Sequence, residues 1–380
     1  MELIYITYQA IPSNTAHGVH TFSLIKNFAR NHTNVSLVYP LREKNKIISI
    51  DKLREKYGFN DNFEIKPTQH FLPFGKVKIF PRITYIFSNA VWSYFISKTY
   101  SKSEYKYIFT LSDWVFYFLS KKGKNIIFEC HNLTKLRIRI LKKALSSNIN
   151  SKVVFINDLI RQDAGFEKDS QVYVLESGYD HDLFTNDDKP DNEKKKIIFS
   201  GNLLRFEEDR GIKEILNYFI ELKLKQNYQL HIVGGPEEYV NELKESISNL
   251  ENSEIFFYGH KDRVDLAKIL NSADIGLMVN KFSKHSERHT SPLKYFEYLG
   301  SGLTVVATEV DSHKILPYSE KINFFNLKDK NSFHKAIIES SNIVGNDYEI
   351  ELSKLTNDYR TKKLIELFTA RPEGLEPSTP

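Results

Sequence analysis

The segment that begins at Ser291 holds the residues of this 380-residue chain that are best suited to bind an anion. Ser291 can cap a helix, and Pro292 suits the first helical position because proline lacks the N–H that has no partner there. The amides of Leu293 and Lys294 would then point out of the helix N-terminus, which favours phosphate oxygens. The positive charge of Lys294 opposes the helix dipole, which suggests that an anionic ligand compensates it. Glu297 could accept hydrogen bonds from two ribose hydroxyls. The alternative is a capped amphipathic helix with an exposed Lys–Glu pair.

A second candidate is a glycine followed by two arginines. Gly201 ends the apolar run at 197–200, and Arg205 and Arg210 follow before the next helical pattern. A strand, a basic loop and a helix make a cradle for a diphosphate, because guanidinium groups match phosphate oxygens. The alternative is a solvated loop in which the acidic residues at 207–209 pair with the arginines.

Two further glycines end apolar runs in the second half of the chain. Gly234 follows the run at 229–233, and Gly259 stands beside His260 at the end of the run at 255–258. Glycine at a strand end allows a ligand to approach the backbone closely. Each of these signals is weak by itself.

Strands and helices that alternate along the chain must position these residues. Short apolar runs such as Leu3–Thr7 and Val35–Tyr39 alternate with helical stripes such as Val19–Arg30. The alternation resumes after the polar run at 186–195, which has the composition of a linker. The pattern predicts an α/β chain with two parallel sheets. Such sheets bind ligands at the carboxyl ends of their strands, so we expect a site between the two domains.

The composition shifts predict four segments. The first domain is expected over residues 1–185 and the second over residues 186–349. An amphipathic stretch at 350–370 is long enough to pack back toward the first domain. The tail at 371–380 has three prolines and no periodicity, and is therefore expected to be disordered.

The motifs of the second half, in this order, resemble the donor-binding domain of retaining glycosyltransferases of the GT-B fold, family 4 (glycosyl transferases group 1). They are Ser-Gly-Asn at 200–202, Arg-Gly at 210–211, Ile-Val-Gly-Gly at 232–235, Phe-Tyr-Gly-His at 257–260, Ala-Asp at 273–274 and Ser-Pro-Leu-Lys-Tyr-Phe-Glu-Tyr-Leu-Gly-Ser-Gly at 291–302. The resemblance implies two Rossmann-like domains facing a cleft and a nucleotide-diphosphate sugar as co-substrate.

The resemblance also implies roles for these residues. The ribose would be held by Glu297, and the base would lie beside Gly259 and His260. The leaving diphosphate would be neutralised by a set of positive groups and helix amides, namely Arg205, Arg210, Lys294 and the amides that follow Pro292. Gly201, Gly234, Ser291 and Leu293 complete the expected donor site. The implied reaction proceeds with retention and without a metal ion, because GT-B enzymes generally stabilise the leaving group with such charges.

The first half resembles the family more loosely. Gly18 matches its glycine loop, whose backbone meets the donor diphosphate, and His131 matches a histidine that faces the sugar. For His131 the alternative is a hydrogen-bonded histidine at a strand end. Two positions depart from the family pattern: His289 stands where a glutamate is common, and Asn202 where an arginine is common.

The net charge of +5 hides a split between the halves. Residues 1–150 carry 23 Lys and Arg against 9 Asp and Glu, whereas residues 151–380 carry 30 against 39. Between 70 and 145, basic residues interleave with aromatic ones, which suits anionic lipid headgroups. We therefore expect peripheral attachment to the inner face of a membrane and a lipid-linked saccharide acceptor, unless the lysines only solubilise the chain. No nucleic-acid-binding signature accompanies the mixture, so no nucleic-acid partner is expected.

Other features narrow the function class. The single cysteine, Cys130, excludes an internal disulfide, and the N-terminus lacks the basic region of a signal peptide, so a cytoplasmic location is expected. No Gly-x-Gly-x-x-Gly follows the first strand, which disfavours a dehydrogenase. The leading hypothesis is a glycosyltransferase of bacterial surface-polysaccharide assembly (lipopolysaccharide or capsule). The alternatives are a nucleotide-sugar 2-epimerase of the same fold and a non-catalytic partner subunit.

Overall fold

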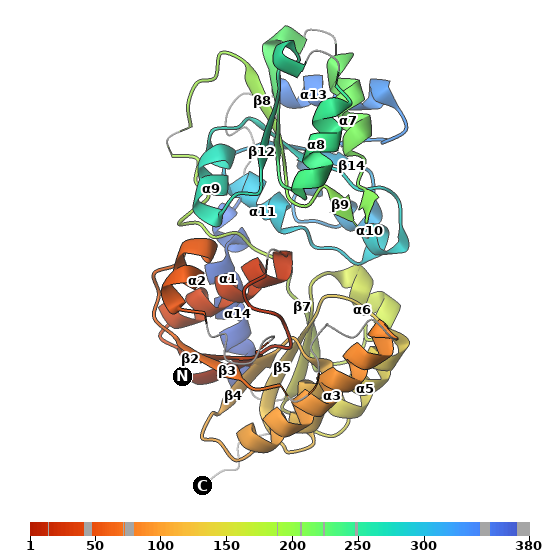
Figure 1. Ribbon diagram of the computed structural model, residues 1–380. Coiled ribbons are helices and arrows are strands. Elements are labelled where there is room, and N and C mark those ends of the chain that lie inside the picture. Colours follow the sequence, from red (N-terminus) through yellow and green to blue (C-terminus); the bar gives the residue numbers. More distant parts are fainter. Residues whose placement is uncertain are drawn as a thin grey trace. The chain divides into compact units, whose positions relative to one another are not determined.

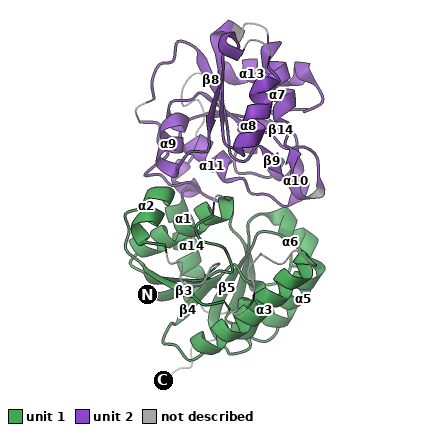
Figure 2. Cartoon of the chain, viewed as in Figure 1, with its two compact units in different colours: residues 1–176, 357–380 green, residues 177–356 purple. Residues whose placement is uncertain are grey.

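The computed structural model describes residues 1–13, 15–41, 48–70, 72, 80–187, 189–205, 207–222, 225–247, 250–342 and 350–370. The chain divides into two compact units (Figure 2). Unit 1 comprises residues 1–176 and 357–380, and unit 2 comprises residues 177–356. Each unit is a parallel sheet covered by helices, which confirms the predicted α/β class.

Unit 1 contains a seven-stranded sheet in the order β3-β2-β1-β4-β5-β6-β7 (Figure 1). Its strands are β1 (Glu2–Ile6), β2 (Asn34–Pro40), β3 (Glu64–Thr68), β4 (Tyr107–Thr110), β5 (Asn125–Cys130), β6 (Ser151–Phe155) and β7 (Val172–Val174). All neighbours pair in parallel. The chain adds β2 and β3 on one side of β1 and then places β4 on the other side of β1. The strand order therefore reverses between β1 and β4.

Helices cover both faces of this sheet. Strand residues alternate between the faces, so that Leu3 and Tyr5 join one apolar cluster and Ile4 and Ile6 the other. The first cluster contains residues of α1 (Ala16–Arg30), α2 (Ile50–Tyr57) and α14 (Asn357–Thr369). The second contains residues of α3 (Pro81–Tyr100), α4 (Asp113–Ser120), α5 (Lys135–Leu145) and α6 (Asp158–Ala164).

Unit 2 repeats this topology with six strands in the order β12-β11-β8-β13-β14-β15. They are β8 (Lys195–Ser200), β11 (Tyr228–Val233), β12 (Ile255–Gly259), β13 (Ile275–Met278), β14 (Thr304–Thr308) and β15 (Ile322–Phe325). A small antiparallel pair, β9 (Leu204–Arg205) and β10 (Glu208–Asp209), follows β8. The order reverses between β8 and β13, so this unit also has a topological switch point.

The helices of unit 2 again form two layers. One apolar cluster contains residues of α7 (Ile212–Ile220), α8 (Glu237–Glu245) and α13 (Lys330–Ser341). The other contains residues of α9 (Arg263–Asn271) and α11 (Leu293–Gly300). Two short helices, α10 (Lys284–Arg288) and α12 (Asp311–Lys314), precede and follow α11.

The chain passes between the units at 176/177 and 356/357, whereas the sequence predicts these boundaries at 185/186 and 349/350. The reason for the first difference is that Tyr179 and Phe184 are buried in the core of unit 2, so the polar run at 186–195 lies inside that unit. After unit 2 the chain returns to unit 1, where Leu364 and Phe368 of α14 are buried. The expected disordered tail at 371–380 lies outside the described residues.

Candidate active site

The topological switch point of unit 2 brings together five of the predicted donor-site residues, namely Gly201, Arg205, Arg210, Gly234 and Lys294. In open parallel sheets, ligands bind outside the carboxyl ends of the strands where the strand order reverses. Gly201 directly follows β8, and Asn280 comes two residues after β13, the strand beside it. The side chains around these two positions therefore lie where such a sheet offers a binding site.

The backbone after β8 and β11 is packed so closely that it requires glycine. The Gly201 N–H donates to the Val233 carbonyl oxygen at 2.9 Å. A Cβ on Gly234 would lie only 1.9 Å from the carbonyl oxygen of Gly201. Gly234 also has a φ of 144°, which L-residues rarely adopt. A side chain at 234 would thus displace the turn that carries Gly201.

Lys294 is the most informative residue at this site. Its Nζ is buried without a hydrogen-bond partner among the described residues and lies 4.0 Å from the centroid of the Phe199 ring. A Cβ on Gly201 would lie 3.3 Å from the same Nζ, so the glycine also makes room for this ammonium group. Burial, together with the charge of Arg210, holds the pKa of Lys294 well below its usual range. A buried amine without a partner is costly, and an anion bound beside it would remove that cost.

Two arginines share one neutral acceptor beside this lysine. Asn280 Oδ1 accepts a hydrogen bond from Arg205 Nη1 at 3.1 Å and another from Arg210 Nη2. Burial and the charge of Arg205 lower the pKa of Arg210 to about 10. Within the residues that the structure describes, no carboxylate forms an ion pair with Arg210. Its positive charge therefore remains available to a ligand.

The orientation of the Asn280 amide follows from a buried histidine. His313 Nδ1 donates to the Thr308 carbonyl oxygen at 2.8 Å, since a carbonyl can only accept. Burial lowers the pKa of His313 to about 4, so the ring is neutral and Nε2 is an acceptor. Asn280 Nδ2 donates to this Nε2 at 3.2 Å, and the amide oxygen must then face the two arginines.

Asp209, one of the acidic residues between the arginines, has other partners. Asp209 accepts hydrogen bonds from the Gly211 and Ile212 N–H groups at 2.8 and 3.1 Å and so caps α7. The same carboxylate lies 3.2 Å from Lys281 Nζ. The interpretation of this loop as a set of internal Arg–carboxylate pairs is therefore wrong for Asp209.

Ser291 does not cap α11, contrary to the sequence-based expectation. The helix begins at Leu293 with Pro292 as its N-cap and no side-chain capping bond. Ser291 Oγ instead accepts a hydrogen bond from the Ser177 N–H at 3.1 Å, and the Ser291 carbonyl accepts one from Ser177 Oγ at 3.2 Å. The first amides of α11 thus lack a capping side chain.

Glu297, the predicted ribose ligand, is buried next to an arginine. Its Oε1 accepts from Arg263 Nη1 at 2.7 Å, and Arg263 Nη2 lies 3.8 Å from Asp180. The Arg263 guanidinium also lies 4.8 Å from the centroid of the Phe184 ring. The arginine fixes the direction of the Glu297 carboxylate, whose role toward a ribose stays a prediction. Gly259, which is predicted to lie beside the base, is the last residue of β12. His260, predicted there too, follows the strand and is exposed.

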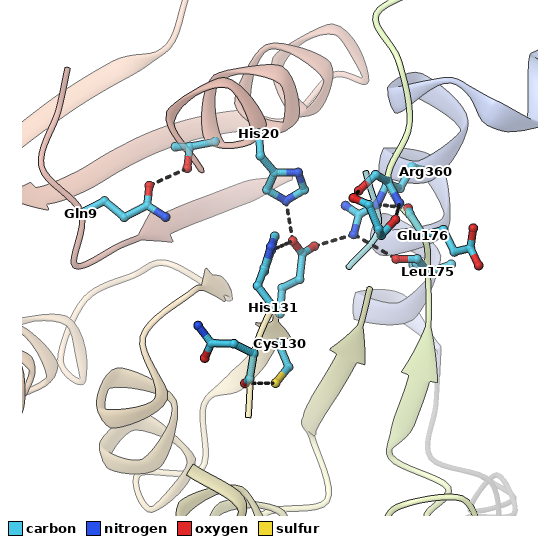
Figure 3. A network of polar contacts seen from close by, with 12 residues as sticks. Gln9, His20, Cys130, His131, Leu175, Glu176 and Arg360 are labelled. Carbon is cyan, nitrogen blue, oxygen red and sulfur yellow. Dashed lines mark hydrogen bonds and ion pairs between the residues drawn. The ribbon is translucent and has the colours of Figure 1, made fainter. Parts of the chain in front are cut away.

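In unit 1, one buried carboxylate joins three cationic or basic side chains (Figure 3). Glu129, the second-to-last residue of β5, accepts from His20 Nε2 and His131 Nε2 at Oε1, the latter at 2.5 Å. Its Oε2 accepts from Arg360 Nη2 at 2.6 Å. His20 comes from α1 and Arg360 from α14, so three distant segments meet at one group.

The protonation of this cluster follows from its contacts. Burial alone would raise the pKa of Glu129, but Arg360 and His20 hold it well below its usual range. Burial lowers the pKa of His131, although the hydrogen bond with Glu129 opposes this. His131 is then a neutral imidazole with its proton on Nε2, which leaves Nδ1 as a hydrogen-bond acceptor.

Gly18, the predicted diphosphate contact of unit 1, is the third residue of α1. Its N–H donates to the Thr15 carbonyl at 3.0 Å, and a Cβ there would lie 2.8 Å from the Tyr57 hydroxyl. The close packing against Tyr57 is by itself a reason for glycine. A contact with the donor stays a prediction.

The cluster around Glu129 is the one place among the described residues where three His, Cys, Asp or Glu side chains could hold a metal ion. The ligand atoms of His20, Glu129 and His131 lie within 4.8 Å of one another. In the structure, however, both imidazoles donate hydrogen bonds to Glu129, and Arg360 already compensates its charge. The donor set fits a hydrogen-bonded network better than a cation.

Sequence reasoning missed several residues of both clusters. Asn280, His313, Arg263 and Arg360 carry no motif, and only the fold brings them to their partners. Glu129 had a usable signal, because residues i and i+2 of a strand face the same side and Glu129 stands two positions before His131. Of the two departures from the family pattern, Asn202 accepts a hydrogen bond from Arg210 Nη1 at its carbonyl oxygen, at 3.3 Å, and the His289 ring centroid lies 6.2 Å from that of His285.

Residues 194–342 match the family model of glycosyl transferases group 1. No curated protein is significantly similar to this chain. Many solved structures share its fold over nearly the whole length, and three of them are compared with it in turn. The apo form of the lipopolysaccharide outer core galactosyltransferase WaaB is 12% identical, with a TM-score of 0.65 over 97% of this chain and 99% of that chain.

Two other structures belong to different enzymes. Sucrose-phosphate synthase from Thermosynechococcus elongatus is 14% identical, with a TM-score of 0.62 over 97% of this chain and 96% of that chain. UDP-GlcNAc 2-epimerase from Methanocaldococcus jannaschii is 9% identical, with a TM-score of 0.60 over 97% of this chain and 99% of that chain. Likeness at such identities shows the fold alone. The predicted GT-B fold and, over residues 194–342, the family resemblance are confirmed.

Proposed function

We propose that this chain, whose residues 194–342 match the glycosyl transferases group 1, transfers a sugar from a nucleotide-diphosphate sugar to a saccharide acceptor with retention at the anomeric carbon. The observation that carries the proposal is the unpaired, buried Lys294 Nζ between Phe199 and Gly201, beside two arginines that share a neutral acceptor. A dianionic diphosphate at this switch point would supply the missing counter-charge.

The proposed reaction depends on stabilising a leaving group. The bond between the anomeric carbon and the donor diphosphate breaks, and both electrons leave with the diphosphate. Lys294, Arg205 and Arg210 neutralise the charge that develops, which is the usual source of rate enhancement when preorganised groups face a leaving anion. The acceptor hydroxyl forms its bond to the anomeric carbon on the face that the diphosphate leaves, which retains the anomeric configuration, and its proton passes to the departing diphosphate.

The first unit would supply the sugar contact. A neutral His131, with Nε2–H directed to Glu129, offers Nδ1 to a sugar hydroxyl. Because Glu129 is held by His20 and Arg360 as well, the ring orientation is fixed before a ligand binds. We assign no enzymic nucleophile.

For the acceptor we propose a lipid-linked saccharide at the inner face of a bacterial membrane, within surface-polysaccharide assembly. The excess of Lys and Arg over Asp and Glu in residues 1–150 supports an anionic partner for unit 1. That one structure of similar fold is a lipopolysaccharide galactosyltransferase agrees with this acceptor class.

The competing function is nucleotide-sugar 2-epimerisation, because a UDP-GlcNAc 2-epimerase shares the fold. An epimerase turns over the donor alone, whereas the proposed transferase requires an acceptor. Incubation with each donor in the absence of acceptor, followed by chromatography of the sugar nucleotide, separates the two. Donor binding without turnover against any acceptor would favour a non-catalytic partner subunit.

A thermal-shift panel with UDP, GDP, ADP and CMP sugars tests the proposal. A ligand present at 100 times its Kd stabilises the folded state by about 2.7 kcal/mol, which corresponds to a shift of several degrees. We expect one nucleotide class to raise the melting temperature of the wild type, and Lys294→Met to abolish the shift. A panel in which no sugar nucleotide shifts the wild type would overturn the proposal.

A further inference from the structure

Helix α3 differs from an ordinary surface helix, because it exposes several large apolar side chains while it buries small polar ones beside Trp92 and Ile96. Large apolar side chains on it are exposed, with exposed fractions of 66% for Ile83, 62% for Phe87 and 52% for Tyr94. A surface helix normally turns its apolar stripe toward the core. On α3, several small polar residues take the buried positions instead: Ser88, Asn89, Ser93 and Ser97.

Buried hydrogen bonds fix this orientation. Asn89 Oδ1 accepts from Ser93 Oγ at 3.0 Å and from Ser112 Oγ at 3.2 Å. Ser112 is the N-cap of α4, the neighbouring helix, and Trp92 of α3 donates from Nε1 to Thr68 at 3.0 Å. Rotating α3 to bury its apolar stripe would break these bonds. The exposed face is therefore a stable property of unit 1.

The exposed residues form one stripe. With 3.6 residues per turn, positions 83, 87 and 94 lie on the same side of the helix, and Lys98 continues this line. Phe80, which precedes the helix, is 72% exposed and falls on the same side. No acidic residue occurs anywhere in α3. The stripe therefore ends at the positive charge of Lys98 and contains no negatively charged side chain.

A basic stripe accompanies it in the same helical layer. The exposed residues of α5 include four basic ones at helical spacing, namely Lys135, Arg139, Lys142 and Lys143. Helices α3, α4 and α5 bury their inner sides in one apolar cluster, and α4 packs against both α3 and α5. Apolar and basic surfaces thus belong to one face of unit 1.

We infer that this face, the α3 stripe together with the basic stripe of α5, docks unit 1 onto the surface of an anionic lipid bilayer. Side chains such as Phe and Ile insert at the boundary of headgroups and acyl chains, and Lys and Arg attract anionic headgroups. The exposed basic residues select an anionic partner, and the apolar stripe in the same helical layer selects a lipid surface, which offers anionic headgroups and acyl chains together. No helix in the described part of the chain has the length and apolar character to cross a membrane. The inference rests on the proposed function and deepens it, because a lipid-linked acceptor would lie in the bilayer onto which unit 1 docks.

Flotation with vesicles of phosphatidylcholine alone or mixed with phosphatidylglycerol tests the inference on the full chain. We expect binding to the mixed vesicles that weakens steeply as the salt concentration rises. The double variant Ile83→Ser/Phe87→Ser should bind at least about tenfold more weakly. The matched control, Ile149→Ser/Phe256→Ser, removes two exposed apolar residues of other surfaces and should bind like the wild type.

The charge contribution is tested separately. Arg139→Gln and Lys143→Gln should each weaken binding to the mixed vesicles about fivefold, which corresponds to the expected attraction per basic residue. Melting temperatures of all variants show whether unit 1 remains folded. Nucleotide-sugar thermal shifts should be unchanged in every variant, so failure of docking is distinguishable from failure of the proposed donor binding.

Five outcomes would overturn the inference. The first four are no binding of the wild type to mixed vesicles, equal binding to neutral vesicles at high salt, equal binding of the control and the α3 variant, and a wild-type dimer that Ile83→Ser/Phe87→Ser dissociates. In the case of the dimer, a second copy of the chain covers the stripe. Binding to single-stranded RNA but not to vesicles, lost in Arg139→Gln, would equally assign the face to another partner.

Discussion

Arg360 and Glu129 form an ion pair of 2.6 Å in unit 1, although 231 residues separate them along the chain. Both side chains are almost fully buried. The chain leaves unit 1 after Glu176, builds all of unit 2, and returns with α14 to place this arginine. Arg360 also donates to the carbonyl oxygen of Glu176 at 2.6 Å, the last residue before the chain leaves. Arg360, which lies just after the chain returns to unit 1, thus connects the end of β5 with the point at which the chain leaves this unit.

Replacing Arg360 with alanine should destabilise unit 1 by about 3–5 kcal/mol, because it leaves the Glu129 carboxylate buried without its main partner. Lys362→Ala is the matched control on α14. It removes an exposed pair with Asp358 and should cost less than about 0.5 kcal/mol. Urea unfolding followed by circular dichroism measures both, and equal losses would contradict the role given to Arg360.

The same pair makes stability depend on pH. Its surroundings hold the pKa of Glu129 below that of the unfolded chain, so the ionised carboxylate stabilises the fold fully above the ordinary value of about 4.3. This contribution is lost as the pH falls further toward the lower folded value. Urea unfolding at pH 7 and at pH 4 should show a smaller loss of stability for Glu129→Gln than for the wild type. A parallel loss in both proteins would contradict the assignment.

Lys294→Met should stabilise the ligand-free protein and abolish its response to donor. The folded state disfavours the charged amine, so between the lowered pKa of the folded protein and the ordinary lysine value the unfolded chain binds the proton more tightly than the folded chain. Stability of the wild type should accordingly rise as the pH increases through this window, and the variant should not show that rise. Melting curves from pH 7 to 9 with and without sugar nucleotide give the result. A variant that is less stable and still binds donor would refute our account of the site.

Asn280→Asp should weaken diphosphate binding about tenfold or more, since a carboxylate would ion-pair with Arg205 and Arg210 and oppose the ligand. Asn280→Ala removes the shared acceptor without adding charge and should weaken binding less. Calorimetric titration with the nucleoside diphosphate compares the two variants. If aspartate were tolerated better than alanine, a neutral acceptor would not be the relevant property of Asn280.

Gly234→Ala should lose donor binding and destabilise unit 2 by at least about 2 kcal/mol, because its Cβ would overlap the carbonyl oxygen of Gly201. Gly123→Ala is the control: Gly123 also has a positive φ, of 71°, but a Cβ there meets nothing within 4 Å. It should cost only about 1 kcal/mol of conformational strain. Unfolding curves and the donor thermal shift are the two measurements.

The sequence by itself determined the α/β class, the alternation of strands and helices and the strand-end positions of Gly201 and Gly234, because these follow from local periodicity and from glycine's backbone freedom. Together with the family resemblance it also singled out Lys294, Arg205 and Arg210 as the positive groups of the expected diphosphate site. Only the tertiary structure revealed that Asn280 and His313 orient those arginines, that Ser291 bonds to Ser177 rather than capping its helix, and that Arg360 joins Glu129. The physical reason is that a hydrogen bond between residues far apart in the chain depends on how strands pair and helices pack. No spacing along the sequence encodes that, whereas periodicity and caps act within a few residues.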